Sequence, residues 1–464
     1  MVSGFIFYSV PLFGTDVPLI VLWLIGGGLF FTLYLKLLNL RGFAHAWSLL
    51  FGKPGTDARG EISQFQALTT AVSGTVGIGN IGGVAVAITM GGPGAAFWLM
   101  LAGFLGMATK AAECTLGQRY RQIEGNGEVG GGPMYYLSAG LGERGMPGLG
   151  RWLGRFYAAS MVVGCLGIGN MFQSNQAAAI INEVSGGLFD GRAWLIGLVL
   201  AVLVGAVILG GLKSIAHTAE RLVPSMALLY LGLGLLVLLA QYERLPGAIS
   251  LIFSSAFNLE AGAGGLLGAM IVGFRRAAFS NEAGLGSASI AHSAARTAYP
   301  AAEGYVALLE PFIDTVVICS LTALIITTTV YDPALAQESG LDGIELTTRA
   351  FVSTFSWSAL PLALVAVLFA FSTMLAWSYY GLKSFMFLLG PRATSQTVWS
   401  LGFKLMFLAF VVLGASMNLA AVVDLSDALV FVVAIPNLIG LYLLAPVVRE
   451  EISRYDAARQ SAAN

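Results

Sequence analysis

Polar residues able to bind an ion or a small ligand interrupt several otherwise apolar stretches of this chain. The first stretch is SGTVGIGNIGG, residues 73–83, which places the carboxamide of Asn80 among five glycines. Glycines and polar residues in the middle of an apolar helix unwind it and free backbone N–H and C=O groups. The N-terminus of a half-helix at such a break carries a partial positive charge that suits an anionic group. The pattern therefore predicts an unwound helix centre at a ligand site.

The same glycines allow two other interpretations. Gly77, Gly79 and Gly82 fit G-x-G-x-x-G, but a dinucleotide-binding turn follows a buried strand and precedes an acid roughly 20 residues later. No soluble α/β unit surrounds the stretch, so the interrupted helix is favoured. Close packing by small residues stays open for Gly82 and Gly83.

Two further stretches carry polar groups at membrane depth. RRAAFSNEAGLGSASIAH, residues 275–292, contains two arginines, an asparagine and a glutamate, and AFSTMLAWSYYG, residues 370–381, contains the adjacent hydroxyls of Ser372 and Thr373. Such hydroxyls often bond back to the carbonyl four residues earlier. Facing an unwound backbone, they would instead suit sodium, a hard cation that takes oxygen ligands much as calcium does. Trp377 lies one helical turn beyond Thr373. Its indole ring either lines a cavity or packs against neighbouring helices.

A fourth stretch repeats the GIGN motif at 167–170 and continues with Asn170, Gln173 and Asn175. Interhelical hydrogen bonding is the simple interpretation of each amide, and a cavity lining is the sharper interpretation of the cluster. Charged residues within apolar segments are functional candidates by default. Those in this chain are Lys110, Glu113, Arg275, Arg276, Glu282 and Asp314. For Glu113 and Asp314 we favour structural ion pairs, and no set of residues resembles an enzyme's catalytic group.

Composition indicates the element that positions these residues, which is the membrane-spanning helix. The chain of 464 residues is 57% hydrophobic and only 11% charged, whereas soluble chains carry about 25% charged residues. Apolar runs of about 20 residues recur along it, each long enough to cross a bilayer, where only helices satisfy the backbone. A net charge of −1 argues against a nucleic-acid partner. We predict an all-α polytopic membrane protein whose eleven spans are 17–38, 64–90, 93–116, 154–184, 193–212, 218–240, 262–294, 303–329, 358–389, 397–419 and 425–447.

Basic residues set the predicted orientation. When each lysine and arginine is assigned to the nearer side of the membrane, nineteen fall on one side and three on the other, and Arg275 and Arg276 fall inside a span. Because cytoplasmic loops are enriched in such residues, the N-terminus is predicted outside and the C-terminus in the cytoplasm.

The two interrupted spans, the second and the seventh, lie five spans apart. An odd offset inverts the topology of the second block of five helices. Inverted repeats whose first helices are broken indicate a secondary transporter. We therefore predict one membrane transporter domain over residues 1–464, with an extra N-terminal helix at 17–40, a first repeat at 62–241 and an inverted second repeat at 262–447.

The motifs resemble those of the alanine or glycine:cation symporter family, also called the sodium:alanine symporters. The matching stretches are GTVGIGNIGGVAVAITMGGPGAAFW (74–98), GGPMYYL (131–137), GIGNMFQSNQ (167–176), FSNEAGLGSASIAHSAARTAYP (279–300), EPFIDTVVICSLTALIITTT (310–329) and AFSTMLAWSYYG (370–381).

The resemblance implies a LeuT-type 5+5 fold and sodium-coupled uptake of small neutral amino acids, alanine and also glycine, across the plasma (inner) membrane. Na⁺ is the implied coupling ion, with no organic cofactor. The substrate residues that it implies are Gly79, Asn80, Gln173, Phe279, Ser280, Thr373 and Trp377. The implied sodium ligands are Ser73, Val76, Asn80, Ser372 and Thr373.

Elementary chemistry agrees with that site. Burying a zwitterionic amino acid in a low-dielectric site costs free energy unless both its carboxylate and its ammonium group have binding partners. Helix N-termini at the breaks would meet its carboxylate and freed carbonyls its ammonium, while Trp377 and Phe279 would limit the side chain. No acid lies in 74–80, so we expect the substrate carboxylate to supply an anionic ligand to sodium. The alternatives are a proton-coupled carrier using Glu282, a channel and, least favoured, a membrane enzyme.

Overall fold

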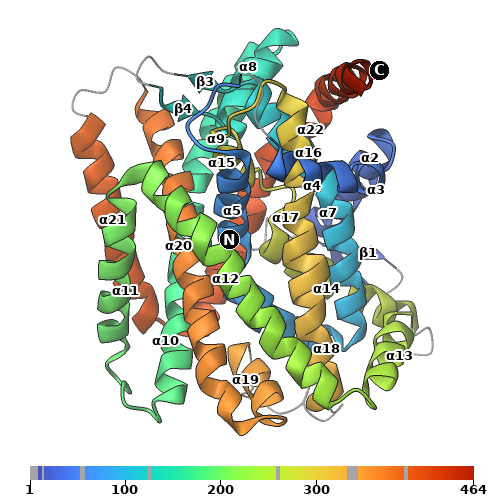
Figure 1. Ribbon diagram of the computed structural model, residues 1–464, viewed down its shortest axis with the longest axis vertical. Coiled ribbons are helices and arrows are strands. Elements are labelled where there is room, and N and C mark those ends of the chain that lie inside the picture. Colours follow the sequence, from blue (N-terminus) through green and yellow to red (C-terminus); the bar gives the residue numbers. More distant parts are fainter. Residues whose placement is uncertain are drawn as a thin grey trace.

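The computed structural model describes residues 9–12, 15–52, 58–123, 127–257, 262–331, 343–390 and 396–463. Two of the nineteen basic residues behind the predicted orientation, Lys53 and Arg392, lie outside these ranges. Within them the protein is helical except for two small antiparallel hairpins, some isolated bridges and the connecting turns (Figure 1). The hairpins pair β1 (Ser9–Leu12) with β2 (Thr15–Pro18) and β3 (Gln122–Ile123) with β4 (Val129–Gly130).

The helices of the first half, in chain order, are α2 (Leu19–Tyr34), α3 (Leu38–Arg41), α4 (Phe43–Phe51), α5 (Gln64–Thr75), the 3₁₀ turn η1 (Ile78–Asn80), α6 (Gly82–Gly91), α7 (Gly94–Arg119), α8 (Pro133–Glu143), α9 (Pro147–Leu166), the π-helical η2 (Gly167–Met171), α10 (Phe172–Val184), α11 (Ala193–Ile208) and α12 (Gly211–Ala240). Those of the second half are α13 (Leu245–Ala256), α14 (Gly262–Asn281), α15 (Ser287–His292), α16 (Pro300–Ala307), α17 (Leu309–Pro311), the π-helical η3 (Phe312–Cys319), α18 (Ser320–Thr329), α19 (Ile344–Val352), η5 (Ser356–Ser358), α20 (Ala359–Leu389), α21 (Gln396–Ser416) and α22 (Leu419–Ala463).

Seven helical stretches in the described ranges are long and apolar enough to cross a membrane. α5 and the η1–α6 segment pass the same test only when taken together as one span, which would be the eighth, and they meet at an angle of 62°. Every one of the eleven ranges predicted as a span contains helix. Two of them, α2 and α11, are apolar but only 16 residues long.

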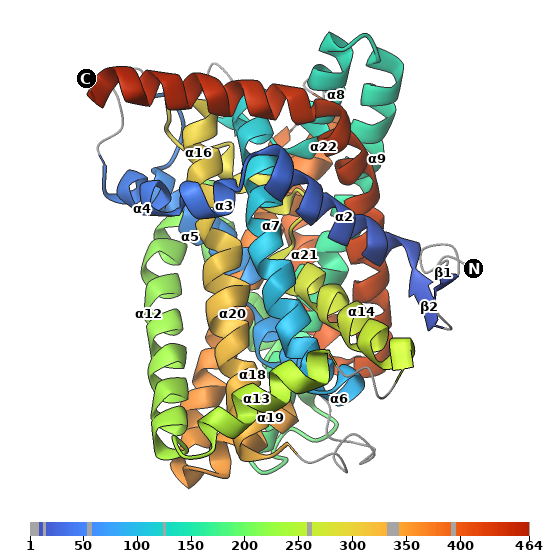
Figure 2. The ribbon, with the colours of Figure 1, turned by 90° about the vertical axis from the view of Figure 1, so that its right-hand side faces the viewer.

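Helices that do not cross the membrane were not predicted from hydropathy. α4, α8, α13 and α19 all fall in connections between the predicted spans, and each is too short to give a span signal. α22 runs 45 residues, well past the predicted end at 447, and carries Pro436 and Pro446 within it. Its charged last part lies across one end of the molecule, above α16 in the view of Figure 2. An ion pair of 2.9 Å between Arg41 and Asp456 holds it there.

Candidate functional site

The first core helix is interrupted at the predicted glycines. α5 ends at Thr75 and η1 begins at Ile78. A Cβ atom on Gly77 would lie 2.7 Å from Oγ1 of Thr373, so α20 packs directly against the break and leaves no room for a side chain. Because helix α5 precedes these glycines, the nucleotide interpretation is removed. The alternative of close packing fits Gly82, whose Cβ would lie 3.0 Å from the backbone N of Ile344, but not Gly83, which faces open space.

The second interrupted helix breaks between α14 and α15. Glu282 adopts a left-handed φ of 56°, and Gly284 and Gly286 follow with φ of 96° and 76°. Glu113 of α7 satisfies the N–H groups freed by this break. Its Oε1 accepts from Gly284 N at 2.8 Å, from Gly286 N at 3.1 Å and from Asn437 Nδ2 at 2.8 Å. The ion pair predicted for Glu113 is therefore wrong among the described residues, since backbone donors take the place of a cation.

Asn80 joins the first break to a buried aspartate that the sequence analysis left out of the site. Its Nδ2 donates to Oδ1 of Asp314 at 2.5 Å and to the Asp314 carbonyl at 3.1 Å, while its Oδ1 accepts from Gly77 N at 3.0 Å. Oδ2 of Asp314 accepts from Ser280 and Thr315, both at 2.7 Å. The structural ion pair predicted for Asp314 is thus wrong too, because no basic group pairs with it in the described chain.

This cluster, Asn80, Ser280, Asp314 and Thr315, collects a carboxylate, an amide and two hydroxyls from three elements. None of the four side chains is more than 2% exposed. Asp314 and Thr315 lie on the π-helical segment η3, and Thr322 one element on donates to the Asn80 carbonyl at 2.9 Å. Carboxylate, hydroxyl and carbonyl oxygens are the ligands of a hard cation. The polar residues within IDTVVICSLT, residues 313–322, could have indicated this cluster. They were not recognised because their spacing does not match one face of a regular α-helix.

The predicted sodium ligands at the other side of the break are also close together. Oγ of Ser372 lies 3.5 Å from the Ser73 carbonyl, and Val76 is the C-cap residue that directly follows α5. In this structure Ser372 and Thr373 donate to the Phe369 carbonyl at 2.9 and 3.0 Å. The two interpretations of these hydroxyls are therefore compatible, since they face the break while bonding within α20.

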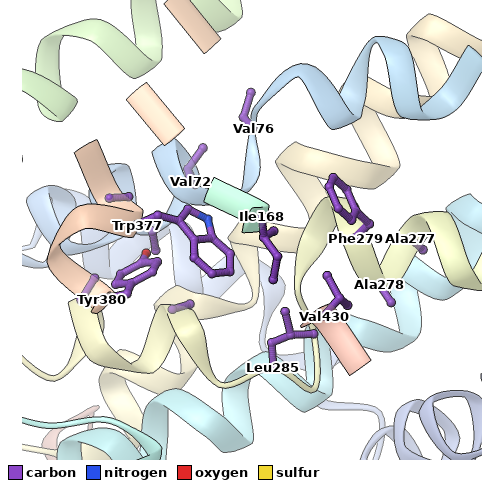
Figure 3. Close-up of a cluster of buried hydrophobic side chains, with 14 of the residues drawn as sticks. Val72, Val76, Ile168, Ala277, Ala278, Phe279, Leu285, Trp377, Tyr380 and Val430 are labelled. Carbon is purple, nitrogen blue, oxygen red and sulfur yellow. The ribbon is translucent and has the colours of Figure 1, made fainter. Parts of the chain in front are cut away.

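Among the predicted substrate residues, Gly79, Phe279 and Gln173 lie at the first break, whereas Trp377 bonds to both Gly74 and Glu282. Gly79 and Phe279 touch, because a Cβ on Gly79 would lie 3.3 Å from the Phe279 ring, and Gln173 accepts from Ile78 N at 3.2 Å. Trp377 is fully buried, and its Nε1 donates to the Gly74 carbonyl at 3.2 Å and to Oε1 of Glu282 at 3.1 Å. In the view of Figure 3, Ile168 lies between the indole of Trp377 and the ring of Phe279.

The other amides of the fourth stretch do not join this site. Asn170 Nδ2 donates to the Phe407 carbonyl at 2.7 Å, and Asn175 Nδ2 donates to the carbonyls of Gly414 and Met417. Both bind the backbone of α21 or the turn after it, as the simple interpretation predicted. Only Gln173 of this cluster reaches the first break.

Charged side chains elsewhere in the described core form ion pairs. Lys110 pairs with Glu310 at 2.8 Å, with both side chains fully buried. His292 Nδ1 lies 2.7 Å from Glu303. Arg275 and Arg276 both contact Oδ2 of Asp427, at 2.8 and 2.6 Å, and so join α14 to α22. The pairs of Arg275, Arg276 and His292 hold the second broken helix to its neighbours, whereas Lys110 and Glu310 join α7 to α17.

Comparison with a solved structure defines the class. The chain matches MhsT, solved in complex with L-phenylalanine, with a TM-score of 0.59 over 85% of this chain and 98% of that one, at 15% sequence identity. The likeness confirms the predicted LeuT-type fold. The protein is therefore a multi-pass, all-α membrane protein of this fold.

The family follows from sequence. Residues 7–464 match the model of the sodium:alanine symporter family, and the chain belongs to that family. It is 41% identical over 451 residues to the sodium/alanine symporter AgcS of Methanococcus maripaludis, covering 96% of each chain. It is also 35% identical to the amino-acid carrier protein AlsT of Bacillus subtilis, over 94% of this chain and 89% of that one. The resemblance is confirmed, and the protein is a sodium-coupled amino-acid transporter rather than an enzyme.

Proposed function

We propose that this protein couples the inward flow of sodium to the uptake of alanine and glycine by alternating access. The observation that carries the proposal is the meeting of two broken helices at one buried oxygen cluster. Asn80 comes from the first break, Ser280 from the last turn before the second, and both bond to Asp314. Broken helices at the midplane are where secondary transporters bind substrate and coupling ions.

Sodium occupies two places in this proposal. One is the cluster of Asn80, Ser280, Asp314 and Thr315, where the aspartate supplies the negative charge that residues 74–80 lack. The other is the end of α5, where the carbonyls of Ser73 and Val76 face the hydroxyls of Ser372 and Thr373. Asp314 changes one expectation, because the substrate carboxylate is no longer needed as the sole anionic ligand.

The substrate is held between the breaks. The N–H groups at the start of α6 meet its carboxylate, and carbonyls freed by the breaks meet its ammonium. Gly79 leaves space for the substrate backbone, Gln173 fixes the η1 turn, and Phe279 and Trp377 limit the side chain to a hydrogen or a methyl group. A hydrophobic pocket excludes bulk by steric contact, whereas one extra methylene changes binding by only about 1–3 kcal/mol.

The protein spans the plasma (inner) membrane with its N-terminus outside and its C-terminus in the cytoplasm. Support comes from the end of the molecule formed by α4, α16 and the last part of α22. Basic residues gather there, and they include Arg41, Arg119 and Arg454, which pair with Asp456 and Glu451. Such enrichment is typical of the cytoplasmic face.

Uptake by the purified protein in proteoliposomes tests the proposal. We expect an inward sodium gradient to concentrate labelled alanine, with competition by glycine and little competition by leucine. Equal uptake with potassium replacing sodium, driven by an inward proton gradient, would support the proton-coupled alternative instead. Non-saturable flux without accumulation would indicate a channel.

A further inference from the structure

The turn between α8 and α9 and the first turns of α9 carry three exposed arginines that the proposed sodium and substrate sites do not use. They are Arg144, Arg151 and Arg155, and within the described ranges their side chains have no hydrogen bond or ion pair. The one acid among residues 138–160 is Glu143, whose Oε2 accepts from the hydroxyl of Tyr120 at 2.8 Å. This segment therefore presents an excess of positive charge that the rest of the described chain does not neutralise.

Several other arginines at the same end of the molecule are already bound. Arg41 pairs with Asp456 at 2.9 Å. Arg119 and Arg454 both pair with Glu451, at 3.2 and 2.5 Å. Those arginines hold the last part of α22 to its neighbours. The three arginines of α8–α9 differ from them, because their guanidinium groups are open to a ligand from outside the chain.

The start of α9 lies where the hydrocarbon core of the membrane meets the lipid headgroups. α9, η2 and α10 form one helical stretch of 38 residues, Pro147–Val184, which at 1.5 Å per residue is about 57 Å long. The hydrocarbon core is only about 30 Å thick, and residues 156–182, which follow Arg155, contain no charged residue. α8 and the start of α9 lie at the same end of the molecule as the last part of α22 (Figure 2). The first turns of α9 therefore extend out of the hydrocarbon core into the headgroup region at that end.

Exposed apolar side chains lie beside the arginines on α9. Trp152 is 60% exposed and Phe156 is 37% exposed, and their rings stack with centroids 5.4 Å apart. Val163, which is 52% exposed, follows at a spacing that continues the same helix face into the bilayer. Aromatic side chains at the headgroup level are typical of membrane proteins. This face of α9 therefore combines positive charge at the headgroup level with apolar area below it.

A phospholipid with a net negative charge matches both features of this face. Guanidinium groups bind phosphate oxygens through paired hydrogen bonds, and basic residues near a membrane surface attract acidic lipids. A soluble anion would satisfy the arginines but would leave Trp152, Phe156 and Val163 without a partner. A zwitterionic lipid would cover the apolar side chains, but its own ammonium group competes with the arginines for the phosphate. The combination therefore favours an acidic lipid over both.

We propose that this face of α8–α9 is a binding site for an acidic phospholipid, whose phosphate lies on the three arginines and one of whose acyl chains lies on the apolar side chains. The residues of the site are Arg144, Arg151, Trp152, Arg155, Phe156 and Val163. The inference goes beyond the proposed function, because it depends neither on the substrate nor on the coupling ion. Only the leaflet that supplies the lipid, the cytoplasmic one, depends on the proposed orientation.

Native mass spectrometry of the purified, detergent-solubilised protein tests the site. The probes are dioleoylphosphatidylglycerol, which is acidic, and dioleoylphosphatidylcholine, which has the same acyl chains but no net charge. We expect the wild type to bind the acidic lipid about a hundredfold more tightly, since each of the three arginines contributes about fivefold. Replacing the three arginines by glutamine is expected to remove this preference. Equal binding of the two lipids by the wild type, or an unchanged preference in the triple variant, would overturn the proposal.

A matched control removes the same charge from the same end of the molecule. Arg41, Arg119 and Arg454, which are bound within the chain, are replaced by glutamine together, and we expect this variant to keep the preference for the acidic lipid. Loss of the preference in both triple variants would show general attraction rather than a site, and would overturn the proposal. Size-exclusion chromatography verifies that the variants are folded. Should either triple variant fail to fold, Arg151→Gln must weaken binding of the acidic lipid by about fivefold and Arg41→Gln must not, and equal binding by the two single variants counts against the site.

Tryptophan fluorescence locates the lipid on α9. Phosphatidylglycerol and phosphatidylcholine that are brominated on their acyl chains quench an indole ring that they touch. The contribution of Trp152 is the difference between the wild type and Trp152→Phe. We expect the brominated acidic lipid to quench that contribution more strongly than the brominated neutral lipid does, and equal quenching would overturn the placement of the acyl chain.

Glycerophosphoglycerol, which is the headgroup of phosphatidylglycerol without its acyl chains, represents a soluble source of the same phosphate. Its binding is measured by native mass spectrometry in the wild type and in the variant without the three arginines. We expect it to bind much more weakly than the lipid, because it leaves the apolar side chains uncovered. Binding as tight as that of the lipid would show a site for soluble anions and would overturn the lipid assignment.

Discussion

At the scale of single residues, the site depends on which groups supply charge. Asn80 and Ser280 are neutral, and the carboxylate they share belongs to Asp314. The same holds at the second break, where neutral backbone N–H groups converge on Glu113. The carboxylate of Asp314 therefore supplies the charge of the proposed sodium site, and the carboxylate of Glu113 holds the second break.

Asp314→Asn is expected to raise the sodium concentration for half-maximal uptake by about tenfold or more, which corresponds to about 1.4 kcal/mol. The amide keeps the size of the side chain but only one of the two acceptor oxygens, so the variant loses the charge together with the bond from Asn80 or the bonds from Ser280 and Thr315. The measurement is alanine uptake against sodium concentration, with alanine affinity determined at saturating sodium. If alanine affinity falls while the sodium curve stays in place, Asp314 contacts the substrate ammonium instead.

Thr373→Ala is expected to weaken apparent sodium affinity more than alanine affinity, because it removes one oxygen from a cation that prefers oxygen ligands. Ser378→Ala is the matched control on the same helix, since its hydroxyl bonds only within α20, to the Leu375 carbonyl at 2.7 Å. Sodium titration of uptake compares the two variants. Equal sodium curves for both would place Thr373 outside the cation site.

At the scale of elements, function depends on breaks in helices rather than on the helices themselves. α5 and the η1–α6 segment turn by 62°, and this bend brings Gly77 against Thr373 of α20. The second break uses three left-handed positions within five residues, Glu282, Gly284 and Gly286. The first break carries the Ser73 carbonyl of the proposed sodium site, whereas the N–H groups of Gly284 and Gly286 at the second break are held by Glu113.

Gly77→Ala is expected to abolish sodium-coupled uptake without preventing insertion. The added methyl group would lie 2.7 Å from Thr373 and 3.1 Å from Gln173, so α20 or the break must shift. Gly83→Ala is the matched control, since no atom lies within 4 Å of its Cβ position, and it is expected to transport normally. Uptake normalised to the amount of folded protein, measured by size-exclusion chromatography, compares them. Normal transport by Gly77→Ala would show that the break tolerates movement.

At the scale of the molecule, the sequence predicted helices and their breaks better than it predicted which helices lie side by side. Hydropathy and glycine placed Asn80 and Glu282 at interruptions of apolar helices and Ser372 within one, and the family motifs predicted the fold. The hydrogen bond between Asn80 and Asp314 joins residues 234 positions apart. It could not be predicted, because a local sequence pattern does not show which faces of two distant helices are in contact. Trp377 illustrates the same limit, because its spacing from Thr373 predicted a shared face but not its bonds to Gly74 and Glu282. α13 and the end of α22 were not predicted, because their residues do not form an apolar run long enough to cross a membrane.

The buried pair of Lys110 and Glu310 belongs to the stability of the whole molecule. It joins α7 to α17, and both side chains are fully buried. Removing one partner of such a pair leaves an uncompensated charge and typically destabilises by about 3–5 kcal/mol, whereas replacing both by apolar groups is often neutral. We therefore expect Glu310→Gln to lower the thermal unfolding temperature of the detergent-solubilised protein clearly, and Lys110→Met combined with Glu310→Leu to restore most of it.

The two variants also separate stability from transport. The double variant keeps the shape of the core but removes charges whose field reaches Glu113 and Glu282. If the pair only stabilises the fold, the double variant recovers sodium-driven uptake together with its unfolding temperature. Recovery of the unfolding temperature without recovery of uptake would show that the Lys110 charge also acts on the carboxyl groups at the second break. An unfolding temperature that Glu310→Gln leaves unchanged would contradict the assignment of this pair to stability.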